Sequence, residues 1–228
     1  MRNFNKFIIA VAMALFIINP IKSYAEESQK IILIDPGHGG FDGGGSSKSG
    51  TIEKDINLNI SLKLKSELEN KGYKVYLTRD TDEGLYEKGT TIKEKKREDL
   101  RKRRDMKEEV KCDAFISIHQ NMFPQEKCYG AQVWYGSNDK SQKLADSVQN
   151  SLKETIQDGN KRVSKPAGDS YLILRDTYEG ASILVECGFL SNQAEAERLK
   201  TEEHKNLIVK GISLGIDKFF EENSKMGS

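Results

Sequence analysis

The 228-residue sequence has little of what several classes of protein require. Three cysteines are too few for the disulfide framework of a small secreted domain. The 36 basic and 35 acidic residues nearly cancel, so charge gives no general case for binding nucleic acid. Only three histidines are present, so a metal site built on them must also recruit carboxylates.

Long apolar runs are also missing, except at the amino terminus. Residues 7–18 are apolar, follow the basic residues Arg2 and Lys6, and precede the small-x-small sequence Ser23-Tyr24-Ala25. This pattern predicts a signal peptide over residues 1–25, cleavage near Ala25 and an exported protein. The alternative is an uncleaved anchor, for which the run is short. Removal of the segment changes the formal charge from +1 to −2.

The cysteines are Cys112, Cys128 and Cys187. A bond between Cys112 and Cys128 is conceivable in an exported protein, but three free thiols are the simpler interpretation. Cys187 as a nucleophile is a further alternative, although no histidine neighbours it in the sequence.

Three short and largely apolar runs end at residues that carry chemistry. They are residues 31–34 with His38, residues 114–118 with His119, and residues 182–185 with Glu186. Such runs are typical of strands buried on both faces of a parallel sheet. Because functional groups collect at the carboxyl ends of parallel strands, we expect these three side chains to meet on one edge.

The remaining pattern alternates helices with strands. We expect helices over 55–70, 90–110, around 144–152 and two at the end of the chain, and strands over 73–78, 131–135 and 171–174. A strand, a helix and a second strand in this order predict parallel pairing. The sequence therefore predicts one α/β domain over residues 29–222, followed by a disordered tail at 223–228. The strongly charged helix 90–110 is typical of a solvated face, and the alternative is a surface for an anionic polymer or a partner.

Two of the histidines are candidate metal ligands. Imidazole and carboxylate are the usual ligands of catalytic zinc, which keeps one position for water. His38 and His119 supply two ligands, and Glu53 or Glu186 is the better candidate for the third. Asp35 and Asp42 compete for that place, and Asp35 could instead orient His38. The third histidine, His204, lies in a hydrophilic segment and is predicted to be at the surface.

Other residues have two interpretations each. Arg79 and Arg175 each follow a predicted strand and are candidates for binding substrate carboxylates, but an ion pair with a neighbouring aspartate is the structural alternative. Asn121, two residues after His119, is a third candidate for substrate binding. The glycine-rich residues 39–45 could suggest a phosphate loop, but they lack the Gly-Lys-Ser/Thr ending.

Four blocks resemble, in order, the signature blocks of the zinc-dependent N-acetylmuramoyl-L-alanine amidases of type 3, which are bacterial cell-wall hydrolases. The blocks are Asp35-Pro36-Gly37-His38-Gly39-Gly40, Glu53, Ser117-Ile118-His119-Gln120-Asn121 and Glu186-Cys187-Gly188-Phe189-Leu190-Ser191-Asn192. The resemblance runs from Ile31 to about Phe220 and is greatest to the spore-cortex subgroup of CwlD-like enzymes. One departure is Lys107-Glu108, where the family often has Ala-Asn, and we expect it to alter the surface beside the cleft.

This resemblance implies that His38, Glu53 and His119 bind Zn²⁺ and that Glu186 is catalytic. It implies a central, mostly parallel six-stranded sheet flanked by helices, with the zinc site at the carboxyl ends of the strands. The implied reaction is hydrolysis of the amide between N-acetylmuramic acid and L-alanine in peptidoglycan, in spore cortex maturation or germination. The alternatives are a zinc peptidase on stem peptides and a non-catalytic wall-binding protein. An accessory envelope protein could target or activate the enzyme, and helix 90–110 is the surface to test.

Overall fold

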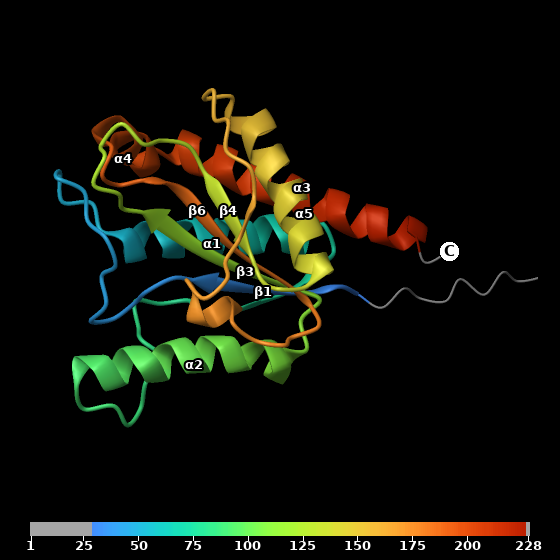
Figure 1. The fold of residues 1–228 in the computed structure, drawn as a ribbon, viewed down its shortest axis with the longest axis horizontal. Coiled ribbons are helices and arrows are strands. Elements are labelled where there is room, and N and C mark those ends of the chain that lie inside the picture. Colours follow the sequence, from blue (N-terminus) through green and yellow to red (C-terminus); the bar gives the residue numbers. More distant parts are fainter. Residues whose placement is uncertain (1–28, 227–228) are drawn as a thin grey trace, which may run out of the picture.

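The three apolar runs form neighbouring inner strands of one six-stranded sheet (Figure 1). The computed structural model describes residues 29–226, so the predicted signal peptide lies outside the described residues. The strands are β1 (Ile31–Pro36), β2 (Lys74–Leu77), β3 (Ala114–Asn121), β4 (Gln132–Tyr135), β5 (Lys165–Pro166) and β6 (Ala181–Phe189). Their order is β2-β1-β3-β6-β4-β5, and only the β4–β6 pairing is antiparallel. The predicted, mostly parallel six-stranded sheet is confirmed.

Helices cover both faces of the sheet. One face carries α1 (Glu53–Asn70), α3 (Asp139–Ile156), α4 (Gln193–Lys200) and α5 (Glu202–Met226), and the other carries α2 (Ile92–Val110) and the short 3₁₀ helix η1 (Leu172–Leu174). The strand period of two decides which side chain faces which layer: Ile32 and Ile34 enter the larger core, whereas Leu33 enters the smaller one. No helix in the described part of the chain is long and apolar enough to cross a bilayer.

The larger core follows the predicted helical spacing. In α1, Ile56, Ile60, Leu64 and Leu68 recur every four residues and are buried against the sheet. In α3 and α5 the same spacing buries Leu144, Val148, Leu152, Ile208, Ile212 and Ile216. Because all the elements from β1 to α5 pack on one sheet, the described residues form one α/β domain. Its predicted limits at residues 29 and 222 stay a prediction.

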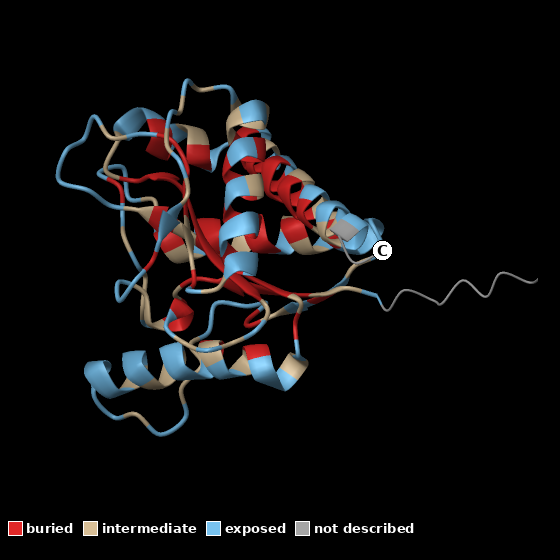
Figure 2. Cartoon of the chain, turned by 45° about the vertical axis from the view of Figure 1, so that its right-hand side comes forward, coloured by how far each residue is buried: buried red, intermediate tan, exposed pale blue. Residues whose placement is uncertain are grey.

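The opposite face is covered by α2, a helix with few apolar residues. Figure 2 shows that most of this helix is exposed. Thr91 and Glu94 form a capping box at its start. Most of the helix is exposed, as predicted, but Arg103 and Lys107 are 1% and 0% exposed. Lys107-Glu108 was expected to alter the surface beside the cleft. For Lys107 this is wrong, because its ammonium is buried and donates to Ile173 O at 2.7 Å, whereas Glu108 is exposed.

Arg103 attaches α2 to the end of β1. Its guanidinium donates to Asp35 Oδ1 at 2.6 Å, to Pro36 O at 2.8 Å and to His38 O at 2.7 Å. Burial alone would raise the pKa of Asp35, but the Arg103 charge and the hydroxyls of Ser117 and Thr78 hold that pKa below its ordinary value. Asp35 is therefore a buried carboxylate whose charge depends on α2.

We expect Arg103→Met to lower the free energy of unfolding by about 3–5 kcal/mol, because it leaves the Asp35 carboxylate buried and uncompensated. Urea unfolding followed by circular dichroism measures the change. Lys102→Met is the matched control: Lys102 pairs with Glu109 at the surface, and its loss is expected to cost less than about 1 kcal/mol. Equal stabilities for the two variants would contradict the role given to Arg103.

Three predictions of local structure are wrong. Residues 171–174 were expected to be a strand, but 172–174 form η1, since a short apolar run does not by itself distinguish strand from helix. Residues 223–226 were expected to be disordered, but α5 extends through them, because residues 216–226 contain neither glycine nor proline. His204 is 7% exposed rather than at the surface, because it lies on the inner side of the first turn of α5, where Glu202 and Glu203 are exposed but His204 and Lys205 are buried.

Candidate active site

The structure brings His38, Glu53 and His119 together at the carboxyl ends of the parallel strands. His38 follows β1, His119 lies in β3, and Glu53 is the first residue of α1. One possible ligand atom of each lies within 4.8 Å of the other two. Glu53 Oε1 is 3.2 Å from His38 Nε2 and 3.0 Å from His119 Nδ1.

This donor set fits zinc. Two imidazoles and one carboxylate are a usual set of protein ligands for catalytic zinc, which leaves a fourth position open. Tetrahedral zinc with bonds of about 2.0–2.1 Å separates its ligand atoms by roughly 3.3 Å. The two observed nitrogen–oxygen distances are close to that separation. Glu186 is not in the cluster. Glu53 lies in the place beside the two histidines, which the residue pattern left open and the family resemblance gave to Glu53.

Two glycines make this approach possible. A Cβ atom at Gly37 would lie 2.3 Å from the His119 ring, and one at Gly44 would lie 2.5 Å from Glu53 Oε2 and 2.6 Å from His38 Cδ2. Gly44 and His38 both have left-handed backbone conformations, with φ of 69° and 62°. A left-handed non-glycine residue is uncommon, and such strain is concentrated at functional sites. The glycine-rich loop thus leaves room for His38.

Asp42, not Asp35, orients His38. Asp42 Oδ2 lies 3.0 Å from His38 Nδ1, and Asp42 Oδ1 lies 3.0 Å from Lys96 Nζ on α2. The prediction for Asp35 is wrong because Arg103, Ser117 and Thr78 occupy its carboxylate. Burial alone would lower the pKa of His38, but Asp42 and Glu53 raise it to about 9. A metal ion that binds this imidazole therefore displaces a proton.

We expect Asp42→Asn to weaken zinc binding by about 10- to 100-fold, because a carboxylate on the second imidazole nitrogen fixes the ring and increases its basicity. Competition with a chromophoric chelator measures the affinity. Asp82→Asn is the control, since Asp82 accepts a hydrogen bond from Gly40 N in the same loop without contacting the imidazole. A zinc affinity that is equal in both variants would count against the Asp42 contact.

Backbone N–H groups fix the Glu53 carboxylate. Oε1 accepts a hydrogen bond from Gln120 N at 3.0 Å, and Oε2 accepts one from Gly45 N at 2.7 Å. Burial opposes ionisation, but the two histidines outweigh it and hold the pKa of Glu53 well below its usual range. Glu53 is therefore a pre-positioned anion, as a metal ligand must be.

Glu186 lies beside this cluster on the next strand. It is opposite His119 in the pairing of β3 with β6, and it is 7% exposed. Its Oε1 accepts a hydrogen bond from Tyr171 Oη at 3.2 Å, whereas its Oε2 is buried and has no hydrogen-bond partner among the described residues. Burial raises the pKa of Glu186, and the nearby His119 opposes this rise. A carboxylate with one free oxygen and a raised pKa is suited to proton transfer.

The Tyr171 contact was missed at the sequence level. Tyr171 was noted only as the start of a predicted strand, but it is the N-cap residue of the 3₁₀ helix η1. The tyrosine ring packs against Trp134 on β4, with ring centroids 5.7 Å apart. The spacing of residues in the sequence does not predict this contact, because Tyr171 and Glu186 are not paired in the sheet and meet only through the path of the chain at η1.

The three predicted substrate residues differ in their surroundings. Arg79 is 2% exposed, and its guanidinium donates to the carbonyl oxygens of Pro36, Gly37, Lys54 and Thr81. It supports the loop that carries His38, and it forms neither of the predicted contacts. Arg175 is exposed after η1, and Asn121 is half-buried at the end of β3.

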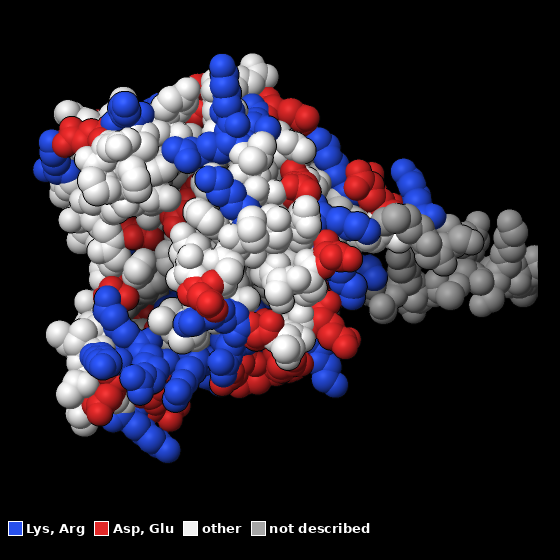
Figure 3. Space-filling view, in the orientation of Figure 1, with Lys and Arg blue, Asp and Glu red and all other residues white. Residues whose placement is uncertain are grey.

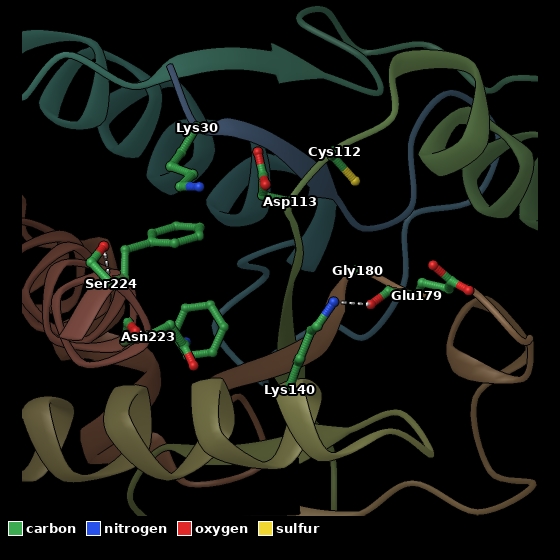
Figure 4. Close-up of a pocket in the computed structure, with 10 residues that line it drawn as sticks. Lys30, Cys112, Asp113, Lys140, Glu179, Gly180, Asn223 and Ser224 are labelled. Atoms are coloured by element: carbon green, nitrogen blue, oxygen red, sulfur yellow. Dashed lines mark hydrogen bonds between the residues drawn. The ribbon is translucent and has the colours of Figure 1, made fainter. Parts of the chain in front are cut away.

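The histidines open into a cavity of about 220 Å³. Its wall includes Lys96 and Leu100 of α2 and Ile173 of η1. A larger cavity of about 410 Å³ lies at the other end of the sheet (Figure 4). There Lys30, Asp113 and Gly180 precede β1, β3 and β6, and no histidine lines the wall. The two histidines of the candidate metal site therefore line the smaller cavity, at the carboxyl ends of the strands.

All three cysteines are free. Cys187 is buried behind Glu186, and burial raises the pKa of its thiol, which does not suit a nucleophile. In the glycine-rich loop, the N–H group of Gly45 donates to the Glu53 carboxylate and not to a phosphate. This contact argues against the alternative of a phosphate loop.

Comparison with known proteins gives consistent matches. The family model for N-acetylmuramoyl-L-alanine amidase matches residues 32–218. The germination-specific N-acetylmuramoyl-L-alanine amidase of Bacillus subtilis is 35% identical, over 86% of this chain and 81% of that protein. The probable cell wall amidase LytH of Staphylococcus saprophyticus is 30% identical. The match covers 85% of this chain and 59% of that protein.

Among solved structures, the CwlD amidase from Clostridioides difficile, in complex with the GerS lipoprotein, is similar to this chain. It is 39% identical, with a TM-score of 0.81, over 85% of this chain and 99% of that chain. The similarity includes the fold and, through the family match, the segments that carry His38, Glu53, His119 and Glu186. The chain therefore belongs to the N-acetylmuramoyl-L-alanine amidases, the hydrolases that act on peptidoglycan.

Proposed function

We propose that this protein is an exported zinc amidase that acts on peptidoglycan of the spore cortex. The observation that carries the proposal is the cluster of His38, Glu53 and His119 beside Glu186, whose second carboxylate oxygen is free. The similarity to a germination-specific amidase supports the spore setting. An amide bond is the fitting target, because its hydrolysis needs an activated water and a proton for the departing amine.

The residues have separate tasks in this proposal. His38, Glu53 and His119 hold the metal, and zinc in such a site acidifies water and polarises a carbonyl oxygen. Glu186 accepts a proton through Oε2 from the water that attacks the carbonyl carbon. When the carbon–nitrogen bond breaks, Glu186 returns that proton to the nitrogen of L-alanine. One carboxyl group therefore acts first as general base and then as general acid.

Digestion of peptidoglycan with residues 26–228, with and without a chelator and followed by mass spectrometry, tests this function. We expect free stem peptides with an amino-terminal alanine, lost on chelation and restored by zinc. Shortened stems that remain attached to the sugar would instead make the protein a peptidase. Absence of any product from zinc-loaded protein would favour the wall-binding alternative or a missing activator.

Export is part of the proposal and rests on the amino-terminal sequence. The basic residues, the apolar stretch 7–18 and the small residues before Glu26 support cleavage after Ala25. Mass spectrometry of the protein recovered from the producing cell's envelope would then give a chain that begins at Glu26. A chain that retains residues 1–25 would favour the uncleaved anchor.

We also propose an accessory envelope protein that docks on α2. The similar CwlD amidase was solved with a lipoprotein, which supports a partner. In this chain, backbone N–H groups of residues 85–91 bind Glu94, Glu98 and Asp99, so these three acidic side chains are held by the preceding loop. Lys and Arg side chains gather over α2 (Figure 3). Such a surface fits a partner with an acidic face.

Site-specific photo-crosslinking in the producing cell tests this docking surface. A crosslinker at Arg101 on α2 is expected to capture an envelope protein. A crosslinker at Lys143, exposed on α3 on the other face of the sheet, is the control and is expected to capture none. No product from Arg101, or the same product from both positions, would count against α2 as the docking surface.

A further inference from the structure

The Glu186 carboxylate has two oxygens in different situations. Oε1 accepts the hydrogen bond from Tyr171 Oη, and Oε2 is buried without a partner among the described residues. A buried polar atom without a partner costs free energy, and in an active site it commonly faces the reacting groups. The difference between the two oxygens of Glu186 therefore depends on the hydroxyl of Tyr171.

Tyr171 is itself held in place. Its ring packs on Trp134, and its backbone caps the amino end of η1, whose Ile173 carbonyl accepts a hydrogen bond from Lys107 of α2 at 2.7 Å. Burial, followed by the charge of Glu186, raises the pKa of Tyr171, so the phenol stays protonated and can only donate to the carboxylate. A fixed ring and a protonated hydroxyl make the direction of this bond constant.

We infer that Tyr171 is a positioning residue for the amidase reaction: its hydroxyl holds Oε1 of Glu186 and so presents Oε2 to the attacking water. This inference rests on the proposed function. Tyr171 keeps its own proton throughout. The proton of the attacking water goes to Oε2 and from there to the leaving nitrogen, while the phenol restricts the carboxyl group to the rotation in which Oε2 faces the cleft.

Tyr171→Phe tests the inference, because it removes the hydroxyl and keeps the ring against Trp134. On a soluble muramyl-peptide we expect kcat to fall by about 10- to 100-fold, with KM, zinc content and melting temperature unchanged, because the loss is one of orientation at the reacting atoms. An unchanged kcat would overturn the inference. So would a fall in zinc content that accounts for the lost activity.

Tyr178→Phe is the matched control. Tyr178 lies in the same segment, but its hydroxyl donates to the Cys112 carbonyl at the other end of the sheet. We expect this variant to unfold at a lower temperature and to keep its kcat. An equal loss of kcat in both variants would overturn the inference. It would mean that removing either tyrosine hydroxyl from this segment lowers kcat by disturbing the fold.

A double variant separates this inference from the proposed function. If Tyr171 acts through Glu186, Tyr171→Phe should slow the Glu186→Gln enzyme no further. An additional loss equal to that in the wild-type background would overturn the inference and leave the amidase function intact. If instead Glu186→Gln keeps wild-type turnover, the proposed role of Glu186 fails first, and with it the inference.

Discussion

His119→Ala is expected to remove stoichiometric zinc binding. Zinc should fall from one equivalent to below about one tenth, because a site with three protein ligands loses one of them and the remaining two belong to different segments of the chain. Amidase activity should be lost with the metal. Elemental analysis of the dialysed protein measures the zinc content, and thermal unfolding with and without added zinc provides a second readout, since only a protein that binds the metal is stabilised by it.

His204→Ala is the control for this result. His204 is buried, lies in α5 and is not part of the cluster of His38, Glu53 and His119. Its replacement should lower stability and leave one equivalent of zinc. Full zinc occupancy in His119→Ala would break the ligand assignment. A loss of zinc in both variants would mean that general destabilisation, rather than a missing ligand, explains it.

Glu186→Gln should keep the bound zinc and lose turnover, whereas His119→Ala should lose both. We expect zinc content and folding to be unchanged and kcat to fall by about 10²- to 10⁴-fold, because the amide can neither accept nor return the proton. The substitution keeps an oxygen that can accept the hydrogen bond from Tyr171. Kinetics on a soluble muramyl-peptide, together with zinc analysis of the same sample, measures both quantities.

Glu195→Gln serves as its control, because Glu195 is another buried carboxyl group near the end of β6. It accepts hydrogen bonds from Gly130 N and Phe189 N and does not belong to the metal-binding group. We expect a less stable enzyme with nearly normal kcat. Wild-type turnover in Glu186→Gln would remove Glu186 from the mechanism.

Much of the fold could be predicted because local patterns of apolar residues indicate its strands and helices. Continuous apolar runs marked β1, β3 and β6, and the four-residue spacing of Ile56, Ile60, Leu64 and Leu68 marked α1. The order of these elements then required parallel pairing, which places the strand ends, and with them His38 and His119, on one edge. The sequence by itself therefore determined where the candidate site lies and which two histidines it contains.

The residue pattern alone did not choose among the carboxylates. Four acidic residues competed for the place beside the two histidines, and the family resemblance implied Glu53. The fold places Glu53 there and Asp42 at the second imidazole nitrogen. Asp35 was excluded by Arg103, which lies 68 positions along the chain. Contacts of this kind have no sequence period, because they depend on how distant segments approach one another.

Contacts between distant segments also explain two features that the sequence did not predict: the buried residues of α2 and the contact made by Tyr171. The spacing of charges predicted a solvated helix, yet the burial of Arg103 and Lys107 depends on Asp35 and on the Ile173 carbonyl, which other segments bring to α2. Tyr171 reaches Glu186 only because its segment turns into η1. The sequence thus determined the scaffold and the edge that carries the site. The tertiary structure alone decided which polar groups meet there, since hydrogen bonds and ion pairs are selected by three-dimensional proximity.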